Sequence, residues 1–182
     1  REGLLFIGSI HREDSPNLDS LRWYRDEILP ALHKVMDNPP RLTFIGYTAP
    51  DLDLAELENI PGLTIRGMVA DLRPAFDEHR LFIAPTRFAA GTPYKVYETV
   101  SYGLPCVATE LLCRQLGWTA DKEIAAVPGN DAAAFASQIA SLYRSEPQWT
   151  AMRDAGLRRL DAENSRGPFE AEVRRILASI AT

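Results

Sequence analysis

The stretch Thr86–Thr109, TRFAAGTPYKVYETVSYGLPCVAT, predicts the end of one strand, a turn, a helix and the next strand. The apolar run Leu81–Ala84 precedes it, and a second run, Pro105–Ala108, lies near its end. The predicted helix between them is Pro93–Tyr102. Thr92 is a residue type that caps helices, and proline is tolerated in the first position of a helix because its missing N–H would have no partner there. A glycine directly after it is expected to end the helix. The stretch is therefore a strand–helix–strand unit.

The start of this helix is a candidate anion site. Backbone N–H groups in the first turn of a helix lack partners, and Gly91 beside them lets a ligand approach closely. Arg87 and Lys95 are the nearby cations. Glu98 lies one turn beyond Lys95, where its carboxylate can accept hydrogen bonds from hydroxyl groups. We predict a diphosphate at the helix start and a ribose diol beside Glu98.

Composition excludes several classes of function. The chain has 182 residues, 46% of them hydrophobic and 25% charged, as in a globular domain with its own core. A formal charge of −5 without any basic run argues against a nucleic-acid partner. No apolar stretch is long enough to span a bilayer and none resembles a signal peptide, so we expect a cytoplasmic protein.

The two cysteines, Cys106 and Cys113, are expected to be reduced and packed in the core. Neither belongs to a CxxC pair or lies near a histidine in the sequence, so no metal site is predicted. The chain begins at Arg1, without methionine and close to a strand, which is typical of a fragment cut at a domain boundary. We therefore expect a single domain over residues 1–182 and a missing N-terminal domain.

Six short apolar runs alternate with helical patterns: 4–7, 42–45, 63–65, 81–84, 105–108 and 123–127. This alternation predicts an α/β fold, a Rossmann-like doubly wound parallel six-stranded sheet with helices on both faces. Pro30 is expected to kink or divide the first helix, and Glu110–Lys122 is interpreted as a loop. Ligands of such sheets bind at the carboxyl ends of the strands. The loops at that edge are Gly8–Asn17, Gly46–Pro50, Gly67–Asp71, Thr86–Thr92 and Thr109–Leu116.

Ordered motifs along almost the whole chain resemble the C-terminal, nucleotide-sugar-binding half of a GT-B glycosyltransferase of the family-4 type. The motifs that carry the resemblance are Phe6–Ser9, Pro16–Trp23, Gly67–Leu72, Ala84–Arg87, Ala90–Thr92, Lys95–Glu98 and Gly103–Thr109. The resemblance implies transfer of a sugar from a nucleoside-diphosphate sugar with retained anomeric configuration, usually without a metal, and no cofactor besides the donor. It also implies that the isolated domain turns over little, because acceptor-binding residues lie on the absent half.

The resemblance assigns roles to individual residues. Glu98 would hold the ribose hydroxyls, and Arg87 and Lys95 would stabilise the leaving diphosphate as catalytic residues. The remaining donor-binding residues are expected to be Gly8 and Ser9 beside the phosphates, Gly67, Met68 and Val69 at the base, and Gly91, Thr92, Pro93 and Tyr94 at the helix start. The partners implied are a nucleotide-sugar donor, an acceptor glycan, lipid or small molecule, and the N-terminal domain, through which peripheral membrane association is possible.

Two departures from the family pattern stand out. Many relatives carry Glu-x7-Glu, but Ala90 occupies the first of these positions here, so the contact with the donor sugar does not carry over. The usual Lys-Gly of the first loop is also absent, and His11, Arg12 and Asn17 stand in that region.

Other interpretations remain open. The chain could belong to a nucleotide-sugar epimerase of the same architecture, or be a degenerate donor domain used for assembly. Glu98 could be a solvated carboxylate paired with Lys95, itself a surface amine, and Arg87 could tether Asp71 or Glu98. Tyr94 is more typical of a packing residue than of a stacking platform.

Overall fold

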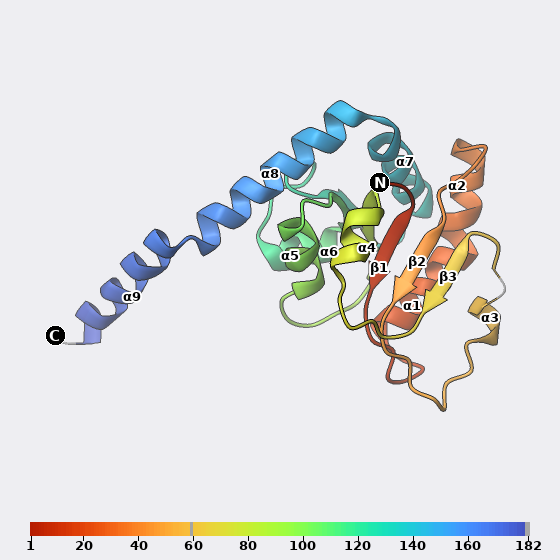
Figure 1. Ribbon diagram of the computed structural model, residues 1–182, viewed down its shortest axis with the longest axis horizontal. Coiled ribbons are helices and arrows are strands. Elements are labelled where there is room, and N and C mark those ends of the chain that lie inside the picture. Colours follow the sequence, from red (N-terminus) through yellow and green to blue (C-terminus); the bar gives the residue numbers. More distant parts are fainter. Residues whose placement is uncertain (59, 181–182) are drawn as a thin grey trace.

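The computed structural model describes residues 1–58 and 60–180, so Asn59 and residues 181–182 of the predicted domain lie outside the described part. Its centre is a six-stranded parallel sheet in the order β3-β2-β1-β4-β5-β6 (Figure 1). The strands are β1 Leu4–Ile7, β2 Leu42–Ile45, β3 Leu63–Arg66, β4 Leu81–Ala84, β5 Cys106–Thr109 and β6 Ala125–Val127. The strand order reverses between β1 and β4, which is where such sheets bind ligands. The predicted fold class is confirmed.

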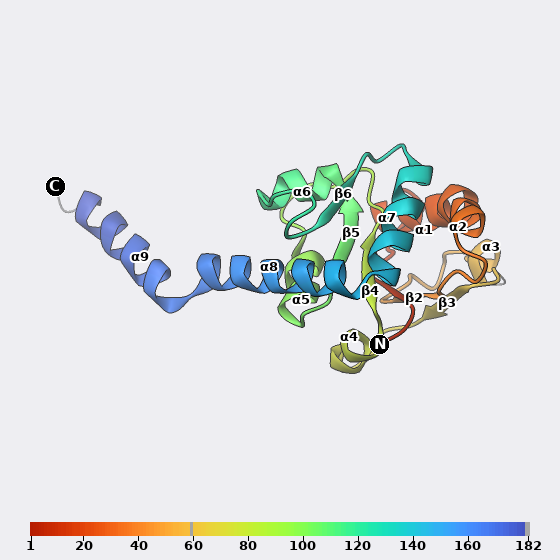
Figure 2. The ribbon, with the colours of Figure 1, turned by 90° about the horizontal axis from the view of Figure 1, so that it is seen from above.

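Helices cover both faces of the sheet. On one face lie α1 Pro16–Trp23, the π-helical turn η1 Tyr24–Ile28, α2 Leu29–Val35 and α7 Ala132–Arg144, and on the other lie α4 Arg73–Glu78 and α5 Tyr94–Ser101 (Figure 2). The remaining helices are α3 Ala55–Glu58, α6 Glu110–Leu116, α8 Glu146–Asn164 and α9 Arg166–Ile180. Pro30 lies in the first turn of α2, directly after the π-helical turn, so the first helical segment changes its hydrogen-bond pattern before Pro30 but is not divided by a break in the helical backbone.

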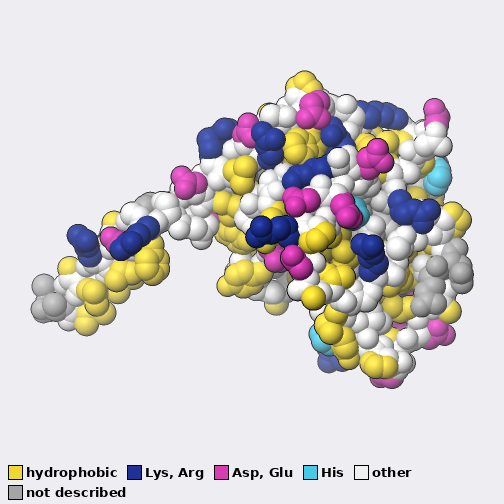
Figure 3. All heavy atoms as spheres, in the orientation of Figure 1, with side chains coloured by type: hydrophobic (Ala, Val, Ile, Leu, Met, Phe, Trp, Pro, Cys, Tyr) yellow, Lys and Arg dark blue, Asp and Glu magenta, His cyan; other side chains and the backbone are white. Residues whose placement is uncertain are grey.

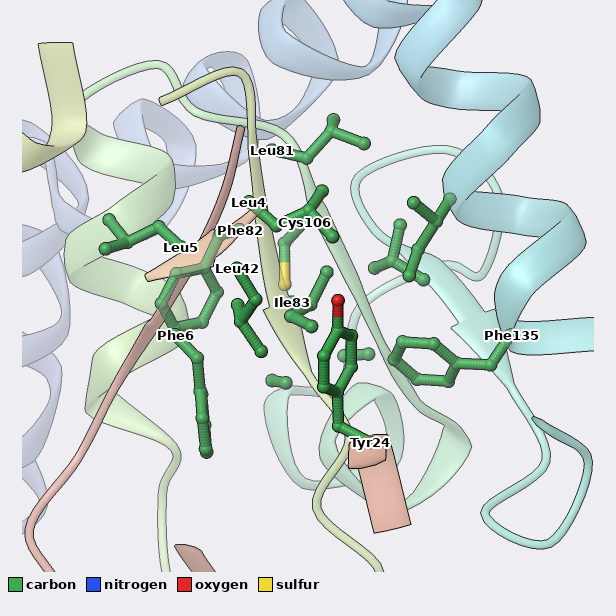
Figure 4. Close-up of a cluster of buried hydrophobic side chains, with 14 of the residues drawn as sticks. Leu4, Leu5, Phe6, Tyr24, Leu42, Leu81, Phe82, Ile83, Cys106 and Phe135 are labelled. Atoms are coloured by element: carbon green, nitrogen blue, oxygen red, sulfur yellow. The ribbon is translucent and has the colours of Figure 1, made fainter. Parts of the chain in front are cut away.

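The core lies on both sides of the two central strands, β1 and β4, whose residues are almost all fully buried. Figure 4 shows Leu4, Leu5, Phe6, Phe82 and Ile83 packed together with side chains from neighbouring strands and helices. Continuous apolar runs suit strands that are covered on both faces. Both cysteines are free and buried, as expected.

The last two helices leave the body of the molecule. Helix α8 packs against α5 and continues into α9, which extends away from the sheet (Figure 1). Helix α9 exposes apolar side chains, visible along it in Figure 3, among them Phe169, Ile176, Leu177 and Ile180. None of the described helices combines the length and the hydropathy needed to cross a bilayer.

Two local predictions are wrong. The segment predicted as a loop contains α6, because Leu112, Cys113 and Leu116 form a buried stripe at helical spacing, and the helix ends at Gly117 with φ +67°. Helix α5 begins at Tyr94 rather than at Pro93, which is its N-cap residue. The side chain of Thr92 does not cap the helix. Instead, the Thr92 carbonyl accepts a hydrogen bond from the Tyr94 amide at 2.9 Å.

Candidate functional site

A hollow of about 250 Å³ opens at the carboxyl edge of the sheet, and we call it the Lys95 hollow. Its walls come from the start of α1, the loop after β4, the start of α5 and one side of α6. The residues around it are Pro16, Asn17, Thr86, Ala89, Ala90, Gly91, Thr92, Pro93, Tyr94, Lys95, Leu112 and Gln115. The structure thus brings together the predicted residues Gly91 to Lys95 with Asn17 of the first loop.

Lys95 occupies the first turn of α5 and is half-buried. Its Nζ donates a hydrogen bond to Asn17 Oδ1 at 2.7 Å and lies 4.6 Å from the centre of the Phe6 ring. Burial lowers the pKa of Lys95 from 10.5 to about 8. The interpretation of Lys95 as an ordinary surface amine is therefore wrong. Among the residues that the structure describes, it has no carboxylate partner.

The first loop packs closely against α1 and β2. Asn17 Nδ2 donates to the Ser9 carbonyl at 2.8 Å. A Cβ atom on Gly8 would lie 2.5 Å from Asn17 Nδ2, and one on Gly46 would lie 1.7 Å from the Gly8 carbonyl oxygen. Both glycines are therefore required by close contacts. Sequence reasoning placed Asn17 in the first loop region but gave no sign of its contact with Lys95.

Arg87 forms an ion pair with Asp19. Its guanidinium binds the Asp19 carboxylate with two hydrogen bonds, one of them 2.9 Å long, and lies 5.5 Å from the centre of the Trp23 ring. This ion pair raises the pKa of Arg87 above its usual value. Arg87 does bind a carboxylate, as one alternative held, but the partner is Asp19 and not Asp71 or Glu98. Arg87 does not line the Lys95 hollow.

Glu98 borders a second, wider hollow of about 920 Å³ between α5 and α8. Thr92 and Tyr94 line both hollows, so Lys95 and Glu98 lie on two sides of one turn. Within the described part of the chain, the Glu98 carboxylate takes part in no hydrogen bond or ion pair, so the alternative that it pairs with Lys95 is wrong. Tyr94 is 78% exposed, which also contradicts a packing role.

The predicted base-binding residues lie apart from these two hollows. Gly67, Met68 and Val69 line a third hollow of about 400 Å³ after β3, and the Met68 side chain is 74% exposed. The residues that the structure describes contain no cluster of three or more His, Cys, Asp or Glu side chains that could hold a metal ion.

Sequence reasoning missed Gln115 because its helix was interpreted as a loop. Its Nε2 donates to the Ala89 carbonyl at 2.9 Å, while its buried Oε1 has no partner among the described residues. Gln115 lines the Lys95 hollow, although its unpartnered Oε1 atom is itself buried.

Comparisons with known proteins agree with the architecture. Three solved structures have similar folds: the C-terminal domain of the glycosyl transferase group 1 protein LpcC from Francisella tularensis, TarM from S. aureus, and Anabaena HepE in complex with UDP. Their TM-scores are 0.68, 0.74 and 0.72, at 14%, 12% and 13% sequence identity. At such identities the likeness concerns the fold alone. No curated protein sequence matches the chain.

The matches cover different shares of the proteins compared. They include 88%, 97% and 98% of this chain, and 85% of the LpcC domain, 34% of TarM and 49% of HepE. The chain thus spans about a third of TarM and half of HepE. The model of the family Glycosyl transferases group 1 matches residues 1–145. The resemblance to GT-B glycosyltransferases is confirmed, and the chain belongs to the group 1 glycosyl transferases.

Proposed function

We propose that this chain is the donor-binding domain of a retaining, metal-independent glycosyltransferase that uses a nucleoside-diphosphate sugar. The observation that carries the proposal is the ammonium group of Lys95, which is half-buried and has no carboxylate among the described residues to neutralise it. An unpaired charge shielded from water costs free energy, and such groups cluster at functional sites. An anionic ligand in the Lys95 hollow would supply the missing negative charge.

A diphosphate suits the surroundings of Lys95. The site lies at the switch point of the sheet and at the start of α5, where the partial positive charge of a helix favours anions. The amides of Tyr94 and Val96 already donate to the carbonyls of Thr92 and Pro93, so Lys95 itself carries more of the electrostatic attraction than free amides do. In the reaction, Lys95 would stabilise the negative charge that develops on the leaving diphosphate.

Glu98 is the proposed partner of the ribose. Its exposed carboxylate has no competing cation among the described residues, so it is free to accept hydrogen bonds from two hydroxyl groups. The donor would bend around the turn at Thr92 and Tyr94 that separates the two hollows. The backbone of Gly67–Val69 would contact the base, and HepE, which was solved with UDP, supports a nucleotide of this kind. The acceptor would bind on a further domain.

Calorimetry with UDP, GDP and dTDP tests the donor site. We expect one of them to bind, and Glu98→Gln to weaken binding by about 10-fold or more, because hydrogen bonds to a charged group are worth about 1.5–3 kcal/mol. Glu2→Gln, at an exposed position before β1 on the opposite edge, is the matched control and should leave affinity unchanged. If none of the three nucleotides binds, the donor site is disproved.

Two further measurements separate the alternatives. Incubation of the active protein with a nucleotide sugar alone would yield an epimer if the protein were an epimerase, whereas a transferase needs an acceptor. If Glu98→Ala left the biological activity of the intact protein unchanged, the chain would be a non-catalytic domain.

A further inference from the structure

The side-chain amide of Asn17 connects Lys95 to the first loop. Its Oδ1 accepts a hydrogen bond from the Lys95 ammonium at 2.7 Å, and its Nδ2 donates to the Ser9 carbonyl at 2.8 Å. An ammonium group can only donate and a carbonyl can only accept. The two partners therefore permit one orientation of the amide and leave the flipped orientation with two unfavourable contacts.

The backbone holds Asn17 in this position. Its amide N–H donates to the Oγ of Ser15, the N-cap residue of α1, at 3.3 Å. On the other side, three atoms of the Asn17 side chain lie 2.5–2.8 Å from the place that a Cβ on Gly8 would occupy. The contact thus requires a glycine in the loop, and the amide cannot shift without moving either the loop or the ammonium.

A neutral amide has an effect on Lys95 that a carboxylate would not have. It fixes the ammonium over the Phe6 ring by a hydrogen bond and adds no negative charge to it, so that no described residue neutralises the ammonium. The ammonium has three N–H donors, and this bond uses one of them, so others remain for a ligand oxygen. An aspartate in the same place would hold the ammonium equally well but neutralise it.

We propose that Asn17 is the positioning residue of the site: it directs the Lys95 ammonium into the Lys95 hollow and couples it to the loop Gly8–Ser9. The identity of the anion rests on the proposed function, in which it is the diphosphate of the donor. The contact itself is independent of that identity. A diphosphate held by Lys95 would therefore also be placed relative to the first loop.

Nuclear magnetic resonance of 13C-labelled lysine tests this proposal directly, because the chain has only three lysines: Lys34, Lys95 and Lys122. Lys34→Arg and Lys122→Arg assign the signals. The probes are inorganic pyrophosphate and then UDP, GDP and dTDP. In the unchanged chain, pyrophosphate should shift the Lys95 signal and leave those of Lys34 and Lys122 in place. Cys106 also faces Lys95, but burial raises the pKa of its thiol, so it stays neutral through the titration.

Two variants separate positioning from charge. Asn17→Ala removes a hydrogen bond that favours the charged form, so Lys95 should titrate at lower pH and bind pyrophosphate about 10-fold more weakly. Asn17→Asp should make Lys95 titrate at higher pH and still weaken pyrophosphate binding, by about 10-fold or more, because the new carboxylate neutralises the ammonium. Asn38→Ala, at an exposed asparagine before β2, is the control and should change neither property.

The outcomes are distinguishable. If pyrophosphate binds at Lys95 equally well in the unchanged chain and in Asn17→Ala, the positioning role is overturned and the proposed function stands. If neither pyrophosphate nor any of the nucleotides perturbs Lys95 in the unchanged chain, the proposed function fails. Thermal melting verifies that each variant is folded, and Asn17→Ser, which keeps a smaller acceptor, replaces Asn17→Ala if the latter does not fold.

Discussion

Replacing Lys95 by methionine should stabilise the chain at neutral pH while weakening its affinity for anions. Methionine keeps a long unbranched side chain over the Phe6 ring but carries no charge. In the folded chain the pKa of Lys95 is about 8, against an ordinary value of 10.5. The unfolded chain therefore binds this proton more tightly than the folded chain does, and below pH 8 the charged lysine lowers the free energy of unfolding.

The size of the effect follows from this difference. One pH unit corresponds to about 1.4 kcal/mol, so the protonated lysine costs on the order of 2–3 kcal/mol at pH 7. Loss of the hydrogen bond to Asn17 offsets about 1 kcal/mol. Lys95→Met should therefore raise the free energy of unfolding by about 1–2 kcal/mol, which is about 2–8 °C in Tm for a chain of this size. Affinity for pyrophosphate or for the donor nucleotide should fall by about 10-fold or more.

Urea unfolding of both proteins at several pH values is the assay. Stability of the unchanged chain relative to Lys95→Met should rise as the pH increases from 8 to 10.5, because the folded lysine then loses its proton first. Lys34→Met, at an exposed position in α2, should change stability by no more than about 0.5 kcal/mol at any pH. A Lys95→Met variant that is less stable at pH 7, or a difference that does not vary with pH, would refute a desolvated ammonium and with it the argument for an anion site.

Two further predictions concern the backbone contacts around the site, and both are measured by urea unfolding. Gly46→Ala should lower the free energy of unfolding by about 3 kcal/mol or more, because its Cβ would lie 1.7 Å from the Gly8 carbonyl oxygen. Gly67→Ala, with no atom within 4 Å of the added Cβ, should leave the free energy of unfolding nearly unchanged. Equal effects of the two substitutions would contradict the close approach of the two loops. Gly156→Ala should destabilise α8 by about 1–2 kcal/mol despite its better helix propensity, because the added Cβ would lie 2.6 Å from Val100 Cγ1. In a double-mutant cycle, Gly156→Ala and Val100→Ala together should cost less than the sum of the two, and simple additivity would show that the two helices do not meet there.

The strands could be predicted from the sequence because each is a short, mostly apolar run with a glycine or proline beside it. Phe82, Ile83 and their neighbours are buried on both faces of a parallel sheet, so burial left no alternation to interpret. Helix α6 was missed because its apolar stripe spans less than two turns and ends in Gly117 and Trp118, which also suit a loop. Short elements such as this depend on tertiary packing more than on local pattern.

The site could be predicted only in outline. Local spacing places Thr92, Lys95 and Glu98 around one turn of helix, but it cannot say which neighbours from distant segments they meet. Asn17 and Lys95 are 78 residues apart, and Asp19 and Arg87 are 68 apart, so each contact joins the first turn of α1 to a segment that follows β4. No periodicity in the sequence encodes such a meeting of elements.

The contacts with Asp19 and Asn17 distinguish Arg87 from Lys95, two cations to which the sequence assigned the same role. Arg87 forms an ion pair with the carboxylate of Asp19, so its positive charge is neutralised within the fold. This ion pair already stabilises the guanidinium group before any ligand binds. Lys95 meets the neutral amide of Asn17, so its charge persists in a half-buried position. An anionic ligand gains more from an unneutralised cation than from one that must first leave its partner. Of the two residues proposed to stabilise the leaving diphosphate, Lys95 is therefore the one that the fold holds ready, and Arg87 could contribute only at the cost of its bond to Asp19.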